Sequence, residues 1–321
     1  MAEPDGSRAP SQRLPLLVAS PAGRRGVVAA SATPPKPDLA LGAAAYYFSA
    51  KVLRSLSPRL RYGAATPGGA AWFWLSAPQR RAALDNYAAV LGLDRSAPEV
   101  SRVARRAFQN YGRMLVDHLL MGSLTSEELL QHMTIDGREH LDAALAGGRG
   151  AIIAAAHMGS WDMAGSYAGV LGFPISAVTE RFPGSLNEAV VRTRRRLGLN
   201  VIMPGRSAVR AISQALQANS IVALLCDLEQ GPGLEVRFFG RRAVVPAGPA
   251  ALALKTGAPL IPANQYATSP GHYHVHLDPP LAIGYGETKQ SLMQRVVDRF
   301  EDFIKERPEQ WYAFRPMFKN E

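Results

Sequence analysis

Cysteine, long apolar runs and the common nucleotide-binding loops are scarce or missing in this sequence. Cys226 is the single cysteine among 321 residues, so no disulfide can form within one chain. No run of eighteen or more apolar residues occurs, which argues against a transmembrane helix. The chain also lacks a Gly-x-Ser-x-Gly turn, a Walker loop and a Gly-x-Gly-x-x-Gly loop. A nucleophile-elbow hydrolase would therefore lack its defining turn, and a nucleotide cofactor has no support.

Acidic residues are outnumbered by basic ones. The chain has 36 lysines and arginines against 26 aspartates and glutamates, which gives a net charge of +10. Nucleic acid, an anionic membrane surface and acidic head groups are the candidate partners of such a chain. No nucleic-acid-binding motif is present, so we expect a membrane surface rather than a nucleic-acid partner.

Composition changes along the chain and predicts its organisation. Residues 1–38 are rich in Pro, Ala, Ser and Arg and show no periodicity, so we expect a disordered tail. Residues 39–321 are expected to form a single domain with an interfacial helix region at 39–77, a helical part at 78–148 and an α/β core at 149–321. Strand and helix patterns alternate in the core, which predicts the α/β class, with a mostly parallel central sheet flanked by helices.

The helix expected within residues 39–63 has an apolar side with aromatic and basic residues beside it. Phe48, Val52 and Leu56 fall at helical spacing, and Lys51 lies among them. Such a helix is suited to lie in a membrane interface. The alternative is a helix packed on the domain core.

Residues 149–163 carry the strongest catalytic signal. The apolar run 151–156 lies between glycines and the polar residues that follow, and it predicts a buried parallel strand ending at His157. The next three residues predict a turn, and Asp162 falls in the first turn of the helix that follows. Open α/β sheets bind their ligands at the carboxyl ends of the strands, which is where this histidine is expected.

We expect Asp162 to point back at His157. Five residues turn about 140° around a helix, so the two side chains can meet only if His157 lies in the loop before it. An imidazole held by a carboxylate is suited to remove a proton from a hydroxyl. Backbone N–H groups at Gly159 and Ser160 would stabilise an oxyanion, and Gly159 would let a ligand approach closely. The alternative is a buried histidine capped by a nearby acid.

Other charged residues follow neighbouring strands or lie on nearby helices. Glu180 and Arg181 end the predicted strand 175–178, and an ion pair of Glu180 with Arg194 or Arg195 would form a positive wall for a phosphate head group. This set is the predicted substrate-binding group, and a surface ion pair is the alternative.

Two acids follow the predicted strand 221–226. Asp227 or Glu229 is a candidate second carboxylate near His157, or a solvated loop acid. A separate pattern, His272-Tyr-His274-Val-His276, places three imidazoles on one strand face, where they could bind zinc. A loose edge-strand face is the more common outcome, and we expect no metal site.

Several stretches occur in an order that resembles the bacterial glycolipid acyltransferases, which comprise the lipid A late acyltransferases and the related phosphatidylinositol mannoside acyltransferases. The first stretch is His157-x4-Asp162 in the form His-x-Gly-x-Trp-Asp, and the resemblance extends over roughly residues 40–318. An aspartate closing this motif and the Glu180-Arg181 pair are more similar to the mannoside branch. The other stretches are Leu225-Cys-Asp227, Val236-Arg-Phe-Phe-Gly240, Ala247–Ala253, Thr256–Pro262 and Pro308-Glu-Gln-Trp311-Tyr.

The resemblance implies an O-acyltransferase that moves a fatty acyl chain from acyl-CoA or acyl carrier protein to a hydroxyl of a glycolipid, most closely a phosphatidylinositol mannoside. It implies direct attack on the thioester, with no further cofactor. We expect a peripheral protein on the cytoplasmic face of the cell membrane. A lipid A-type acceptor and an inactive lipid-binding homologue are the alternatives. After Asp227 the chain has Leu-Glu-Gln where the family more usually has an acidic pair around an arginine, so the acceptor stays open.

Overall fold

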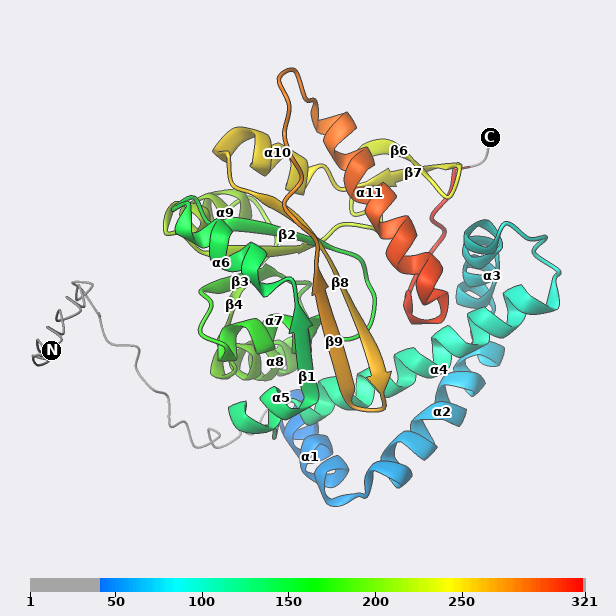
Figure 1. The fold of residues 1–321 in the computed structure, drawn as a ribbon. Helices are drawn as coiled ribbons and strands as arrows, with labels where there is room; N and C mark the ends of the chain where they lie inside the picture. The colour runs from blue at the N-terminus through cyan, green and yellow to red at the C-terminus, as the bar shows by residue number, and fades with distance from the viewer. Residues whose placement is uncertain (1–40, 320–321) are drawn as a thin grey trace, which may run out of the picture. The chain divides into compact units, whose positions relative to one another are not determined.

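A computed structural model describes residues 41–319 (Figure 1). The tail expected at residues 1–38 lies outside the described residues. A run of helices comes first, and strands and helices alternate after it. The helices are α1 (Leu41–Ser55), α2 (Pro58–Leu75), α3 (Ala77–Leu91), α4 (Pro98–Leu120), α5 (Ser126–His132), α6 (Arg138–Ala146), α7 (Trp161–Val170), α8 (Gly184–Arg196), α9 (Ala208–Gln217), α10 (Gly248–Thr256), α11 (Lys289–Glu306) and the 3-10 turn η1 (Pro308–Gln310).

Seven strands form one central sheet. They are β1 (Met133–Asp136), β2 (Ala151–Ala155), β3 (Ile175–Val178), β4 (Leu199–Ile202), β5 (Ile221–Leu225), β8 (Leu260–Ser269) and β9 (His272–Leu277). Their order is β1-β9-β8-β2-β5-β3-β4, and every neighbouring pair is parallel except the hairpin β8–β9. The expected α/β class with a mostly parallel sheet is therefore confirmed.

Strand β2 shows why helices cover both faces of this sheet. All five of its residues are buried, and successive side chains point to opposite faces. Ile152 and Ala154 pack in one core cluster with residues of α9, α10 and α11. Ile153 and its two odd-numbered neighbours pack in a second cluster with α5, α6 and α7. An apolar run without alternation is what a strand between two helical layers requires.

Two segments differ from the sequence-based expectations. Strand β1 lies within residues 78–148, which were expected to be helical, and pairs with β9 at the sheet edge. A second strand that the sequence did not predict, β7 (Arg241–Val245), pairs antiparallel with β6 (Leu234–Phe238) outside the central sheet. Both strands have long-range or hairpin partners that a local pattern does not reveal.

Helix α2 was not expected in full because Pro67 and several glycines weaken its helical pattern. Packing against α4 explains one of these glycines. A Cβ at Gly69 would lie 2.3 Å from the carbonyl oxygen of Phe108, so only glycine permits this close approach of the two helices.

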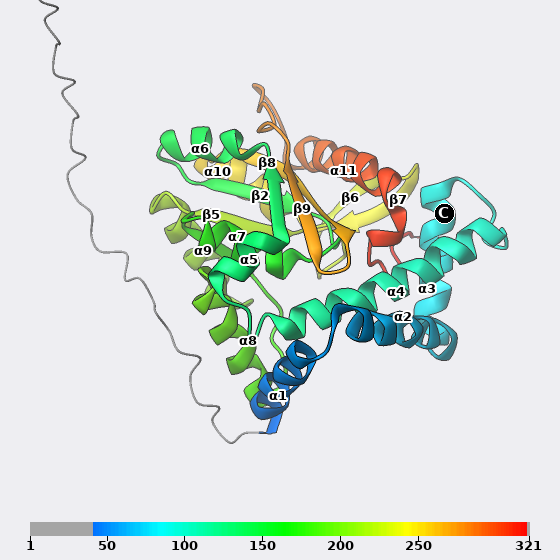
Figure 2. The same cartoon turned by 60° about the horizontal axis from the view of Figure 1, so that its bottom comes forward.

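Helix α1 packs on the domain by one side and exposes the other. Ala43, Tyr46 and Ala50 are buried, whereas Phe48 is 69% exposed and Val52 is 41% exposed. Figure 2 shows α1 and α2 next to α4. One face of α1 thus packs on the domain core, as the alternative expected. The opposite face, with Phe48 and Val52, is in contact with solvent. None of the helices within residues 41–319 is both long and apolar enough to span a membrane.

Candidate active site

Strand register places a histidine beside a carboxylate at the carboxyl ends of two central strands. Ala155, the last residue of β2, pairs with Leu225, the last residue of β5, in a parallel ladder. His157 and Asp227 each lie two residues further along their chains, so the same register brings their side chains together. The residues belong to the carboxyl ends of adjacent parallel strands, where open α/β sheets place their ligands.

The carboxylate of Asp227 accepts three hydrogen bonds. Its Oδ1 lies 2.6 Å from Nδ1 of His157, and its Oδ2 accepts the backbone N–H of His157 at 3.0 Å and the indole N–H of Trp311 at 2.8 Å. Asp227 has no exposed surface. Burial raises its pKa, but the charge of His157 and these hydrogen bonds outweigh burial and hold the pKa of Asp227 below its ordinary value.

This geometry fixes the tautomer of His157. An ionised carboxylate can only accept a hydrogen bond, so Nδ1 carries the proton and Nε2 carries the lone pair. Nε2 has no hydrogen-bond partner among residues 41–319, and the His157 side chain is 16% exposed. Trp161 lies edge-on to the ring at a centroid distance of 5.3 Å. The site therefore presents one basic nitrogen, oriented from behind by a buried negative charge.

The expected contact between His157 and Asp162 is wrong. Asp162 is buried in the first turn of α7 and accepts a bidentate pair from Arg194, at 2.8 and 2.9 Å. Nδ1 of His118, near the end of α4, lies 2.9 Å from the same carboxylate. Burial raises the pKa of Asp162, but Arg194 and His118 outweigh it and hold the pKa well below its ordinary value. Asp162 thus joins α7 to α8 and α4.

The predicted oxyanion donor at Gly159 is already used. Its N–H donates to the carbonyl oxygen of Gln310 at 3.2 Å. The residue has a φ of +52°, and a Cβ would lie 2.4 Å from the carbonyl oxygen of Gln265. Glycine is therefore required by the close approach of β8 rather than by a ligand. Ser160 is completely buried, and its Oγ has no hydrogen-bond partner within residues 41–319.

The C-terminal segment holds the turn that carries His157. The N–H of Tyr312 donates to the carbonyl oxygen of His157 at 2.8 Å, and Met158 forms an antiparallel bridge with Trp311. Gln265 donates to the carbonyl oxygens of Ala156 and Met158, both at 2.9 Å. Trp311 lies in the Pro-Glu-Gln-Trp-Tyr stretch of the family resemblance, but nothing in the sequence pattern indicates its contact with Asp227.

Among the predicted substrate-binding residues, Asp227 is the one with a hydrogen bond to His157 in residues 41–319. Glu180 lies 4.0 Å from Arg315, with both side chains mostly exposed, so its predicted pairing with Arg194 is wrong. Arg194 is buried on Asp162 instead. Arg181 and Arg195 are exposed. Of the two acids after β5, Asp227 is the carboxylate at His157, and Glu229 is an exposed acid that Lys319 contacts at 2.7 Å.

The three imidazoles of β9 have protein partners. His274 and His276 contact Asp136, and His276 also contacts Asp278. No cluster suited to hold a metal ion occurs in the part of the chain that the structure describes. His274 and His276 thus have carboxylate partners, and His272 Nδ1 lies 3.4 Å from the carbonyl oxygen of Pro270. Strand β9 lies between β1 and β8, so the expected edge-strand position is wrong.

The fold and the dyad of His157 and Asp227 define an α/β enzyme with an oriented base at the carboxyl ends of its central strands. Residues 39–320 match the family described as bacterial lipid A biosynthesis acyltransferase. The chain is 32% identical over 241 residues to the phosphatidylinositol mannoside acyltransferase of Mycobacterium tuberculosis, a match that covers 73% of this chain and 75% of that protein.

The relative of the same name from Mycolicibacterium smegmatis is 30% identical over 219 residues, covering 67% of this chain and 71% of that protein. The chain belongs to the bacterial lipid A biosynthesis acyltransferase family, and it is an acyltransferase.

Proposed function

We propose that this acyltransferase moves a fatty acyl chain from acyl-CoA or acyl carrier protein to a hydroxyl of a phosphatidylinositol mannoside. The proposal combines the family assignment with the activity named for the mycobacterial relatives. The single observation that carries the chemistry is the Asp227–His157 dyad, whose Nε2 is available as a general base.

The proposed reaction needs one proton carrier. His157 Nε2 takes the proton of the acceptor hydroxyl, and the oxygen attacks the thioester carbonyl carbon. The C–S bond breaks, an ester forms, and the leaving thiolate receives the proton from the imidazolium. The buried charge of Asp227 stabilises that imidazolium while the proton is held. No covalent enzyme intermediate is required.

The proposed place of the reaction is the cytoplasmic surface of the cell membrane, with the protein bound peripherally. Phe48 and Val52 on α1 and Leu60 on α2 are exposed, and Lys51 and Arg59 lie beside them. Exposed apolar side chains flanked by lysine and arginine are suited to enter the interface of an anionic membrane.

The decisive experiment offers labelled palmitoyl-CoA and palmitoyl carrier protein to the purified protein, with a panel of glycolipid acceptors read by mass spectrometry. We expect acylated phosphatidylinositol mannoside with wild-type protein. Transfer only to a lipid A precursor would identify the alternative acceptor, and vesicle binding without transfer would indicate an inactive homologue. His157→Ala should lower kcat by orders of magnitude while the protein stays folded. Near-normal transfer by a folded His157→Ala protein would contradict the mechanism.

A further inference from the structure

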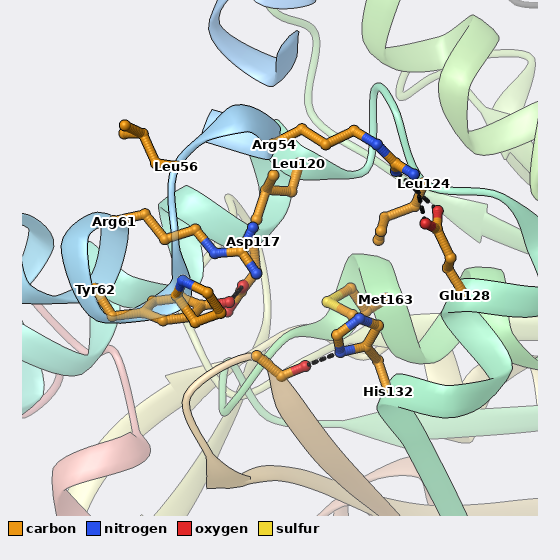
Figure 3. Close-up of a pocket in the computed structure, with 12 residues that line it drawn as sticks. Arg54, Leu56, Arg61, Tyr62, Asp117, Leu120, Leu124, Glu128, His132 and Met163 are labelled. Atoms are coloured by element: carbon orange, nitrogen blue, oxygen red, sulfur yellow. Dashed lines mark hydrogen bonds and ion pairs between the residues drawn. The ribbon is translucent and has the colours of Figure 1, made fainter. Parts of the chain in front are cut away.

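A polar cleft opens between the helices α1, α2, α4 and α5, separate from the dyad (Figure 3). Its volume is about 320 Å³, within the range of small-molecule sites. The turn between β8 and β9 closes one side at Gly271, and Met163 of α7 contributes to its wall. The cleft is thus bordered by the same helix whose N-terminus follows the catalytic turn.

Two arginines line this cleft, and one of them is already neutralised. Arg54 forms a bidentate pair with Glu128, at 2.5 and 2.8 Å. Arg61, by contrast, has no carboxylate within ion-pair distance in residues 41–319, and its Nε is buried without a hydrogen-bond partner. A buried donor that lacks a partner is unfavourable, so an acceptor that entered the cleft would relieve this.

The acidic group that faces Arg61 is committed to other partners. Asp117 accepts hydrogen bonds from the hydroxyls of Tyr62 and Tyr273, both at 2.5 Å. Figure 3 shows Arg61 reaching toward this carboxylate across the cleft. His132, which also lines the cleft, binds the carbonyl oxygen of Gly271 through Nδ1, and burial lowers its pKa, so it adds no positive charge at neutral pH. The guanidinium of Arg61 lies 5.2 Å from the centroid of the Tyr62 ring, and its charge acts to lower the pKa of Asp117. Neither contact is an ion pair, so Arg61 is the lining arginine whose charge is available to an anionic ligand.

The mouth of the cleft continues the exposed apolar face of α1 and α2. Leu56 lines the cleft and is 37% exposed, and Leu60 is 62% exposed. A face of this kind at a membrane interface would bring the cleft to the level of the lipid head groups. Arginine pairs well with phosphate oxygens because its planar fork donates two parallel hydrogen bonds.

We propose that this cleft binds the phosphodiester of an anionic lipid head group through Arg61. The source is either the glycolipid acceptor or a bulk phospholipid, and both share this chemistry. The inference rests on the proposed membrane-bound function for the source of its ligand. Its two binding tests use no thioester, so failure of binding and failure of acyl transfer are distinguishable.

The first measurement is binding of soluble probes to the full-length protein by calorimetry. We expect glycerophosphoinositol to bind wild-type protein and Arg61→Gln to weaken it by at least about tenfold, with Arg61→Lys between them. Arg105→Gln, which removes an exposed arginine of α4 that does not line the cleft, is the matched control and should change affinity by less than about twofold. Equal effects of Arg61→Gln and Arg105→Gln would overturn the proposal. Binding of inorganic phosphate as tightly as the diester would also overturn it. Thermal unfolding verifies that each variant is folded.

The second measurement compares phosphatidylcholine vesicles that contain phosphatidylglycerol with vesicles of equal surface charge that contain oleate. Wild-type and Arg105→Gln proteins should prefer the phosphatidylglycerol vesicles, and Arg61→Gln should lose the preference. A preference unchanged by Arg61→Gln would refute the site. In transfer assays, a raised KM for the glycolipid with Arg61→Gln assigns the site to the acceptor. An unchanged KM with the lost vesicle preference assigns it to bulk phospholipid.

Discussion

Replacing Asp227 by asparagine tests the dyad directly, because the variant keeps the size of the side chain and removes its charge. The Oδ2 position accepts two N–H groups, from the His157 backbone and the Trp311 indole, and Oδ1 accepts the third from His157 Nδ1. Asparagine has one acceptor oxygen and one NH2 group. The oxygen is expected at the Oδ2 position, where it satisfies two donors, so the NH2 group faces Nδ1.

The expected consequence is the wrong tautomer of His157. An NH2 group facing Nδ1 makes that nitrogen an acceptor, and the proton moves to Nε2, which can then no longer act as a base. The charge that stabilised the imidazolium is lost as well. The same change in a Ser-His-Asp triad lowers kcat about 10⁴-fold. We therefore expect Asp227→Asn to lower kcat about 10³- to 10⁴-fold, or about 4–5 kcal/mol of activation free energy.

The assay follows release of free thiol from acyl-CoA in the presence of the acceptor. Cys226 is buried, so the protein's own thiol does not interfere with the signal. Asp162→Asn is the matched control, because it weakens the pair with Arg194 but leaves the dyad in place. It should lower the melting temperature while the folded protein keeps its kcat within about tenfold. Folded Asp227→Asn with near-normal kcat, or a larger loss of kcat in folded Asp162→Asn, would refute the reasoning.

Three further changes test the surroundings of the site. Trp311→Phe removes the indole N–H from Asp227, and the thiol-release assay should show kcat reduced about tenfold or more; unchanged kcat would show that two hydrogen bonds suffice to hold the carboxylate. Gly159→Ala places a Cβ against the Gln265 carbonyl at a positive φ and should lower both the melting temperature and kcat. A variant with both values unchanged would contradict this prediction. Burial raises the pKa of Asp117 from 3.8 to about 6, so the folded protein binds the carboxyl proton more tightly than the unfolded chain does. This group therefore lowers the free energy of unfolding as pH rises from about 4 to about 6. Asp117→Asn should remove that contribution, up to about 3 kcal/mol in urea unfolding between pH 4 and 7, and an identical pH slope would contradict it.

The elements that the sequence predicts well are those whose pattern is local. Strand β3 has the predicted bounds, because a short apolar run identifies a buried strand. The position of His157 at the end of β2 follows from the same local pattern. The full length of helix α2 and the strand β1 were not predicted, because packing on α4 and pairing with β9 decide them.

The hydrogen-bond partner of His157 could not be predicted from spacing. Asp227 is seventy residues away in sequence, and it reaches His157 through the pairing of β2 with β5. A sequence pattern shows that both residues follow strands, but it does not show which strands are adjacent in the sheet. The hydrogen bond from Trp311 to Asp227 is harder still to predict, because it depends on the path of the chain after α11.

Charge balance explains why Asp162, which is nearer in sequence, does not orient the imidazole of His157. Arg194 is 4% exposed, and a buried guanidinium without a carboxylate destabilises a protein by about 3–5 kcal/mol. Turning Asp162 toward His157 would leave Arg194 in that state, whereas Asp227 meets the histidine at no such cost. The two carboxylates therefore have separate tasks. Asp227 orients the ring, and Asp162 fixes the start of α7 against α4 and α8, so that the turn between β2 and α7 is held at both ends.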